Sequence, residues 1–247
     1  MTRRRWIADE VRGNRAFLTG SHADHLIRVL RVRPGQMFDI ATGTKVFRGK
    51  VAGISDTEVE FELGEELPAM PDKAKVTLAL SIFKFDRMEW AIEKCTELGV
   101  DRIVPVISRR TDPHLASASA KRLERWSRIV RQASEQSRRV SPPEMSAPLK
   151  LKEVLALAAS VRLVLSESED ELPLVEALHG ETLGTDTVLA IGPEGGWTTD
   201  EMQLFRESGW LPVSLGKNIL RSETAAIAAL AIMLSAGSWL RVASSRQ

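Results

Sequence analysis

The spacing of apolar and polar residues changes character near residue 72. Before it, apolar residues form short runs at 16–20, 36–42, 45–54 and 58–63, separated by Gly, Pro and Asp. Runs of this length between turn residues predict strands of a small β-barrel or sandwich. A single helix interrupts them, and Ser21 is placed to cap it. Residues 64–75 carry two prolines and several charges without periodicity, so a linker is expected there, with domains at 1–72 and 73–247.

After this boundary, strands alternate with helices, which predicts an α/β domain with a largely parallel sheet. Strands are expected at 76–82, 101–108, 161–167, 187–192 and 211–216, and helices at 86–99, 119–139 and 222–240. The last helix is rich in alanine and has little polar surface. Such a helix is expected to be buried, in the core or in a subunit interface. The helix expected at 86–99 is predicted to have one apolar face and to end at Gly99. This face comprises Met88, Ala91, Ile92, Cys95 and Leu98.

The composition is that of a folded protein with a proper core. The chain has 247 residues, of which 43% are hydrophobic and 27% charged. No run approaches the roughly 20 apolar residues that cross a bilayer, and no apolar stretch follows the basic N-terminus, so neither a membrane span nor a secretory signal is predicted. The single cysteine, Cys95, excludes an internal disulfide and zinc sites of paired cysteines, and favours the cytoplasm.

The net charge is only +1, but the charges are unevenly distributed. Residues 1–50 and 102–139 are strongly basic, whereas residues 51–72 are acidic. Two basic patches suit a protein that follows a phosphate backbone. They also suit ordinary solvated faces, and charge alone does not separate the two interpretations.

The stretch "IGPEGGWTTDE" at 191–201 breaks a strand with glycines. Gly192, Gly195 and Gly196 leave backbone groups uncovered by side chains, and Thr198 with Glu201 fits a capping box, so a helix begins at once. Bare backbone at the carboxyl end of a parallel strand predicts a ligand site. The spacing is neither G-x-G-x-x-G nor a P-loop, so a phosphate site is not favoured. A plain strand-to-helix turn is the alternative.

A second glycine turn lies in "VSLGKNILRSETAAIAAL" at 213–230. A strand again ends at a glycine, Gly216, and Ser222 can cap the final helix. Between them, Ile219 and Leu220 are apolar residues in a short loop. They suit the walls of an adenine pocket, or alternatively a plug that closes the core beneath the helix.

Together the two stretches resemble the paired signature of the SPOUT methyltransferases, and more closely the ribosomal RNA small subunit methyltransferase E family. Residues 25–36, 84–110 and 121–139 agree as well, so the resemblance spans almost the whole chain. Three positions depart from the family pattern. Many members have glycine in place of Phe85, a phenylalanine in place of Trp197, and a glycine in place of Arg138.

The resemblance implies a SPOUT-type α/β domain tied in a deep trefoil knot, preceded by a PUA-like or OB-like β-barrel that binds RNA. It further implies transfer of a methyl group from S-adenosylmethionine to uridine N3 of 16S rRNA, at uridine 1498 of the decoding region, by a homodimer that completes the site across its interface. No metal is expected, because this transfer needs positioning and charge placement. Two alternatives remain: a knotted enzyme that methylates a ribose 2′-hydroxyl on rRNA or tRNA, and a non-catalytic RNA-binding assembly factor.

Matching to the family motifs implies the cofactor-binding and catalytic residues. Arg221 would stabilise the anion that develops on the base, and Glu223 would accept the N3 proton or orient Arg221. The alternative for this pair is a structural ion pair that caps the last helix. The cofactor-binding residues would be Leu165, Ser166, Glu167, Ile191, Gly192, Pro193, Glu194, Gly195, Gly196, Leu215, Gly216, Ile219, Leu220, Thr224 and Ala225.

Basic residues supply the candidates for RNA contact. His25, Arg28 and Arg31 lie at helical spacing and are expected to share a face. Trp6 either stacks on a base or lies in the core of the first domain. A metal site from His22 and His25 has no cluster of carboxylates or cysteines to support it, so none is predicted. The full set of predicted RNA-binding residues is Arg5, His25, Arg28, Arg31, Arg87, Arg109 and Arg138.

Overall fold

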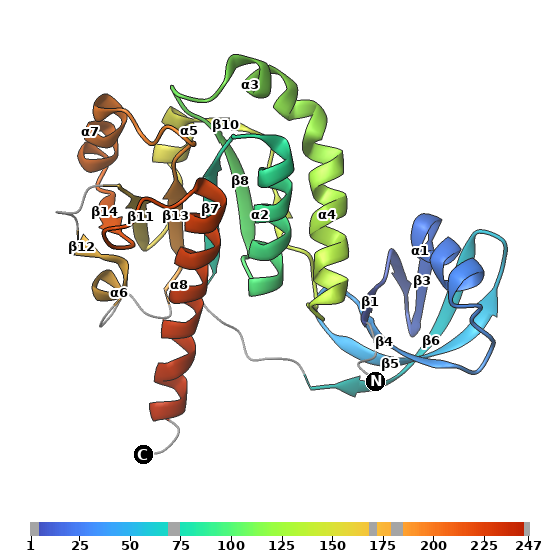
Figure 1. The fold of residues 1–247 in the computed structure, drawn as a ribbon. Coiled ribbons are helices and arrows are strands. Elements are labelled where there is room, and N and C mark those ends of the chain that lie inside the picture. Colours follow the sequence, from blue (N-terminus) through green and yellow to red (C-terminus); the bar gives the residue numbers. More distant parts are fainter. Residues whose placement is uncertain (1–4, 69–74, 168–171, 179–184, 245–247) are drawn as a thin grey trace. The chain divides into compact units, whose positions relative to one another are not determined.

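The computed structural model describes residues 5–68, 75–167, 172–178 and 185–244, with side chains in the last range up to residue 235. The chain divides into two compact units (Figure 1). One comprises residues 1–71 with 131–142, and the other residues 72–130 with 143–247. A division at residue 72 alone did not anticipate that residues 131–142 pack with the N-terminal unit.

The N-terminal unit is built on one six-stranded sheet with the strand order β1-β4-β5-β6-β3-β2. All neighbours are antiparallel except β1 and β4. Four of the strands lie where short apolar runs predicted them. The side chain of Trp6 is only 1% exposed and lies in the core with Leu18 and Phe61, so it does not stack on RNA. The strands are β1 (Arg5–Ile7), β2 (Glu10–Arg12), β3 (Arg15–Thr19), β4 (Met37–Ala41), β5 (Val46–Ile54) and β6 (Glu58–Leu67).

The helix that interrupts this sheet differs from the prediction. It consists of α1 (Gly20–Asp24) and a π-helical turn, η1 (His25–Val29). Thr19 occupies the N-cap position, so the assignment of Ser21 as the cap was wrong. A π-helical turn holds more residues than an α-helical one, and Arg31 lies beyond its end in the left-handed region, with φ 49°. His25, Arg28 and Arg31 therefore do not continue a single α-helical face.

Polar side chains join the end of α4 (Leu123–Gln136) to α1 and to the loop between β1 and β2. Arg131 forms an ion pair with Asp9 at 2.8 Å, and His22 Nε2 lies 3.2 Å from the carboxylate of Glu135, whose side chain is fully buried. Burial alone would raise the pKa of Asp9. The hydrogen bonds from His22 and from the amide of Thr19, with the charge of Arg131, outweigh burial and lower that pKa below its ordinary 3.8. The folded N-terminal unit thus favours ionised Asp9.

This pKa shift predicts how the stability of the N-terminal unit depends on pH. A carboxyl whose pKa is lowered by folding stabilises the fold above its unfolded pKa, and this contribution is lost as the pH falls through the folded value. Asp9→Asn is therefore expected to weaken the unit at pH 6 but to reduce its further loss of stability between pH 4 and pH 2. Urea unfolding across this range measures it. Identical stability curves for Asp9→Asn and wild type from pH 6 to pH 2 would refute the prediction.

The C-terminal unit contains an eight-stranded sheet in which every described pairing is parallel. The strand order is β10-β8-β7-β13-β11-β14-β12, with β9 paired to β8. The alternation of strands and helices in the sequence predicted this arrangement. The strands are β7 (Val76–Ser81), β8 (Arg102–Ile107), β9 (Glu144–Met145), β10 (Leu149–Lys150), β11 (Val161–Leu165), β12 (Leu172–Pro173), β13 (Thr187–Ile191) and β14 (Leu211–Ser214).

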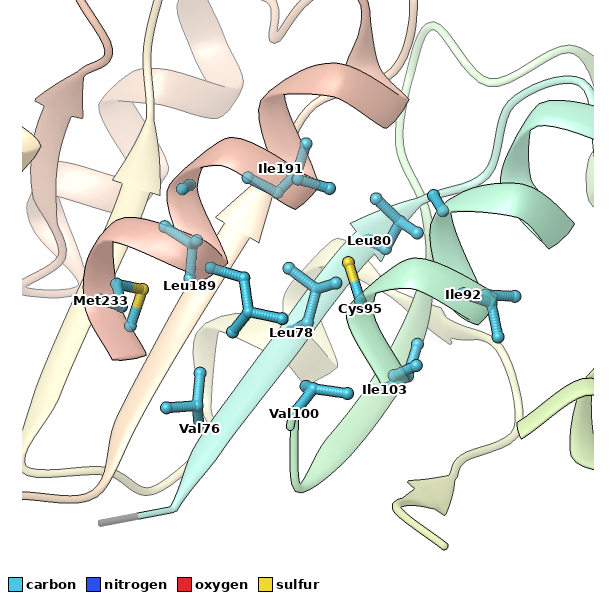
Figure 2. Packing of buried hydrophobic residues seen from close by; sticks show 14 of the residues in the cluster. Val76, Leu78, Leu80, Ile92, Cys95, Val100, Ile103, Leu189, Ile191 and Met233 are labelled. Carbon is cyan, nitrogen blue, oxygen red and sulfur yellow. The ribbon is translucent and has the colours of Figure 1, made fainter. Parts of the chain in front are cut away.

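Helices cover both faces of this sheet because alternate residues of each buried strand point to opposite sides. Leu78 and Leu189 face α2 and α8 (Figure 2), whereas Ala79 and Ala190 belong to a second cluster with Phe205. In α2 the predicted apolar face is buried except at its end, where Leu98 is 40% exposed. Besides α4, the helices are α2 (Phe85–Leu98), α3 (Pro113–Ser119), α5 (Leu151–Leu155), α6 (Leu174–Ala177), α7 (Thr199–Glu207) and α8 (Ser222–Ser244). None of the described helices is long and apolar enough to cross a membrane.

Candidate active site

Three loops meet at one edge of the C-terminal sheet. They follow β11, β13 and β14, which are parallel neighbours, and the carboxyl ends of parallel strands lie at the same edge. The loops enclose a cavity of about 190 Å³. Its lining is Leu165, Ser166, Glu167, Ile191, Gly192, Pro193, Gly196, Trp197, Met202, Leu215, Gly216, Asn218, Ile219, Leu220, Ser222 and Ala225.

The glycine loop, defined as residues 192–196, is held in shape by its own backbone and by the helix that follows. The amide of Gly196 donates to the carbonyl of Pro193 at 2.8 Å, and Gly196 has φ +67°. A Cβ at Gly196 would lie 3.1 Å from the carboxylate of Glu167, so the loops after β11 and β13 approach each other closely here. The predicted capping box is present, with Thr198 as N-cap and Glu201 bonded back to it.

Glu201 also anchors the start of α7 to the end of β8. Its buried carboxylate accepts from the amide of Arg109 at 2.8 Å and from the amide of Thr198 at 2.9 Å. A buried carboxylate that accepts several N–H bonds is well compensated for the loss of water. The glycine loop therefore lies between two fixed elements, β13 and α7.

The loop after β14 has a different construction. The hydroxyl of Ser214 accepts from the amide of Gly216, which has φ +104°, and no atom lies within 4 Å of a Cβ built there. Ile219 is 81% exposed, whereas Leu220 is half-buried. The alternative that both residues plug the core does not hold for Ile219, because a plug would be buried.

Twelve of the fifteen residues predicted to bind cofactor line this cavity. The other three face elsewhere. Glu194 forms an ion pair with Arg87, Gly195 lies against the side chain of Arg110, whose guanidinium donates to the carbonyl of Gly195, and Thr224 is exposed on α8. The motif match marked whole stretches of sequence, and only the folded loop distinguishes the residues that face inward.

Four lining residues were not predicted: Trp197, Met202, Asn218 and Ser222. Trp197 and Asn218 lie within the two quoted motifs, so their neighbours in sequence were a usable signal. Met202 lies one helical turn after the capping residue Thr198, on the helix that the capping box predicts. Its position toward the loops depends on how α7 packs, which the sequence does not indicate.

The two predicted catalytic residues lie in different environments. Arg221 is exposed, and its carbonyl accepts from the amide of Ala225, which places it at the start of α8. Glu223 is only 5% exposed, and Arg87 Nε lies 3.9 Å from its Oε1. The helix begins with Ser222 already inside it, so the expectation that Ser222 caps the helix was wrong.

The predicted RNA-binding residues are divided between the two units. In the N-terminal unit, Arg28 is highly exposed and pairs with Asp24 at 3.3 Å, while His25 is half-buried beside the ring of Trp6. Arg5 donates to the carbonyl of Arg138. Burial lowers the pKa of the Arg5 guanidinium. The negative charge of the nearby Asp39 opposes this shift, and the positive charge of Arg138 adds to it.

In the C-terminal unit, the arginines predicted to contact RNA are already paired. Arg109 is exposed and forms an ion pair with Asp200 at 3.0 Å. Arg87 is only one-third exposed and lies 3.1 Å from Glu194. Within the described ranges, no group of three or more His, Cys, Asp or Glu side chains gathers as metal ligands.

The three departures from the family pattern have structural counterparts. Phe85 packs edge-on against Trp126 and lies under the guanidinium of Arg122, so it is part of the helix packing. Arg138 has φ 60°, a conformation that glycine adopts without cost. The indole nitrogen of Trp197 is buried and donates to no residue that the structure describes.

Comparison with known proteins agrees with this fold. Residues 70–234 match a family model described as an RNA methyltransferase domain. A ribosomal RNA small subunit methyltransferase E of Synechocystis sp. is 38% identical over 226 residues, covering 87% of this chain and 71% of that protein. Its counterpart in Rickettsia conorii is 31% identical, with 90% of each chain covered. The crystal structure of a ribosomal RNA small subunit methyltransferase E from Neisseria gonorrhoeae bound to S-adenosyl methionine is 34% identical, with a TM-score of 0.84 over 95% of this chain and 98% of that one.

The C-terminal unit has a parallel sheet with a cavity at its carboxyl edge, and the family model for an RNA methyltransferase domain matches most of its length. The protein is therefore an RNA methyltransferase. Similarity extends beyond this unit to the N-terminal sheet, since the curated relatives cover nearly the whole chain. The chain belongs to the ribosomal RNA small subunit methyltransferase E family.

Proposed function

We propose that this protein transfers a methyl group from S-adenosylmethionine to N3 of a uridine in 16S rRNA, at position 1498 of the decoding region, and so forms 3-methyluridine on the small ribosomal subunit. The observation that carries the proposal is the convergence of the loops after β11, β13 and β14 around one cavity lined by glycines and apolar side chains. Family membership supports the reaction class.

The residues of the cavity fit a nucleoside attached to an amino acid. Leu165, Leu215 and Leu220 provide apolar walls, and backbone groups of Gly192, Leu215 and Leu220 would read the edge of an adenine. The carboxylate of Glu167, close to Gly196, is suited to accept hydrogen bonds from ribose hydroxyls. A Cβ at Gly196 would meet that carboxylate, so glycine keeps the approach to it open.

S-adenosylmethionine, when bound, supplies an electrophilic methyl group. The residues of the chain would hold the uridine and manage its proton. The N3 proton must leave before or during transfer, and negative charge then spreads over the neighbouring carbonyl oxygens of the base. Arg221, exposed at the start of α8, would stabilise that charge. Glu223, buried two residues further along, would accept the proton or orient Arg221.

Identification of the methylated nucleoside tests this function. Small subunits or 16S rRNA that lack the modification are incubated with the protein and S-adenosylmethionine, and digested to nucleosides for mass spectrometry. We expect 3-methyluridine. A ribose 2′-O-methylated product would instead establish the related chemistry on the same fold. Absence of a methylated nucleoside, with no heat of S-adenosylmethionine binding in calorimetry, would establish an RNA-binding assembly factor.

We also propose that the N-terminal sheet is a PUA-like barrel that binds the rRNA through Arg5, His25, Arg28, Arg31 and Arg138, and that Arg109 contributes from the C-terminal unit. Although Arg28 pairs with Asp24, 76% of its side chain is exposed, compared with 68% for Arg109. Arg31 is exposed as well and lies two residues beyond the end of the same π-helical turn. Exposed arginines that are not held in buried ion pairs are suited to phosphate contact.

Charge reversal at Arg28 and Arg31 is therefore expected to weaken rRNA binding and to flatten its salt dependence. Each lost phosphate contact should reduce the slope of log K against log salt by about 0.7 for single-stranded RNA. Filter binding over a range of salt concentrations measures the slope. Arg12→Glu, at an exposed arginine of the same unit that pairs with Glu10, is the matched control. If the double variant and the control have equal slopes, the two arginines do not contact RNA.

Two further parts of the proposal concern architecture. β14 pairs with β11 and β12, but α8, which follows it at once, packs on α2 and β13. The chain must therefore return across the sheet edge between them, and we propose that this return forms the trefoil knot. The predominantly apolar α8 supports a homodimer in which a second copy completes the site. Sedimentation of the purified protein at micromolar concentration should show the dimer.

A further inference from the structure

Arg87 connects the two segments that flank the cavity without lining it. It lies in the first turn of α2, and its Nη1 is 3.1 Å from Glu194 Oε1, in the glycine loop. Its Nε is 3.9 Å from Glu223 Oε1, in the first turn of α8. Both carboxylates have cavity residues as neighbours in sequence: Pro193 precedes Glu194, and Ser222 precedes Glu223. One guanidinium therefore bridges the end of β13 and the start of the last helix.

Glu223 depends on this contact because it is almost completely buried. Only 7% of its side chain is exposed, and its Oε2 accepts no hydrogen bond from any residue that the structure describes. A buried carboxylate without compensation is strongly unfavourable. The positive end of α8 compensates part of the charge, and Arg87 supplies a full opposite charge at 3.9 Å.

The same contacts make Arg87 a poor partner for a phosphate. Its side chain is one-third exposed, and two carboxylates already face it, so the group of three carries a net charge of −1. An approaching phosphate would be repelled by Glu194, whose side chain is 40% exposed. The ion-pair geometry thus disfavours the role in RNA binding that the sequence suggested for this residue.

We propose that Arg87 is a positioning residue for methyl transfer: it holds Glu223 as a buried carboxylate with Oε2 free to accept a proton or hydrogen bond from the substrate, and it fixes the glycine loop through Glu194. This rests on the proposed function. It couples the shape of the loop that binds the cofactor to the residue that meets the base, although Arg87 itself touches neither.

Single-turnover methyl transfer at saturating rRNA and S-adenosylmethionine tests the proposal in Arg87→Met. We expect the rate to fall on the order of 100-fold, as for other losses of catalytic positioning, with the affinity for rRNA and its salt slope unchanged. Arg87→Lys keeps a charge but not the two-sided contact, and should recover part of the rate. Lys94→Met, at a basic residue of the same helix that is also one-third exposed and pairs with two carboxylates, should leave the single-turnover rate near wild type.

A double-mutant cycle separates positioning from folding. If Arg87 acts through Glu223, then Arg87→Met should slow the reaction little in a Glu223→Gln background. Additive losses, or a wild-type rate in Arg87→Met with a weaker and less salt-dependent RNA affinity, would overturn the proposal. Thermal unfolding of each variant shows whether a lower rate reflects lost structure. If Arg87→Met does not fold, the rate of Arg87→Lys tests the proposal instead. Failure of the wild-type protein to methylate would instead refute the proposed function.

Discussion

Gly196→Val is expected to lower the affinity for S-adenosylmethionine by one to two orders of magnitude. Gly196 has φ +67°, a region in which a residue with a side chain costs about 1–2 kcal/mol and a β-branched one more. The added Cβ would also lie 3.1 Å from Glu167. Glu167 is the end of a flexible chain and can move, but its carboxylate lines the cavity, so relief of the contact alters the site. About 1.4 kcal/mol corresponds to a tenfold change in Kd. Calorimetry with S-adenosylmethionine measures the loss.

Two other glycines with positive φ, Gly43 and Gly216, provide controls for this result. Gly43 lies in the N-terminal unit with φ +90° and no atom within 4 Å of a Cβ, so Gly43→Val carries backbone strain without contact with the site. It should bind the cofactor like wild type. Gly216→Ala, with φ +104° and open space beside it, tests strain alone at the cavity. Wild-type affinity in a folded Gly196→Val protein would show that the cavity does not bind the cofactor.

Arg221→Ala is expected to slow methyl transfer by about 100- to 1000-fold with little change in cofactor affinity. Removal of one group that stabilises developing negative charge has an effect of this size in other enzymes. Arg221 contributes its carbonyl to the first turn of α8, and that bond survives the substitution. The side chain is exposed, so the fold should tolerate its loss. Single-turnover experiments with saturating rRNA measure the rate of methyl transfer, and calorimetry measures the affinity for S-adenosylmethionine.

Lys217→Ala is the matched control, since Lys217 is an exposed basic residue of the same loop. Its rate should remain close to wild type, which would exclude a general effect of loop charge on the rate of methyl transfer. Equal losses in rate and in cofactor affinity for Arg221→Ala would place Arg221 in cofactor binding and remove it from catalysis. Arg221→Lys adds a graded measure, because lysine retains the charge but not the planar arrangement of donors.

Local sequence signals determined the elements that border the site. The capping box of Thr198 and Glu201 predicted where α7 begins, since it depends only on residues three apart. Alternating strands and helices predicted the parallel sheet, and parallel strands bring their carboxyl-end loops to one edge whatever their order. The two glycine motifs, together with the resemblance to the family, therefore located most of the cavity lining.

The sequence alone determined less about the N-terminal unit, where the helix is short and its turns irregular. A period of 3.6 residues placed His25, Arg28 and Arg31 on one face, but the backbone forms a π-helical turn and then a left-handed residue. Similarly, the helix predicted at 119–139 gave no sign that its final turns belong to the other unit. Such choices follow from packing, here the buried cluster around Glu135 and Arg131, and no local pattern encodes them.

The sequence by itself thus determined the longer strands and helices of the C-terminal unit and which loops carry glycines, because these properties depend on neighbouring residues. Only the tertiary structure decided which side chains of those loops face the cavity and which charges meet. Arg87, Glu194 and Glu223 are far apart in the chain, and each is ordinary in its local context. Their pairing requires α2, β13 and α8 to be in place, since an ion pair depends on distances of a few ångström between residues that folding alone brings together.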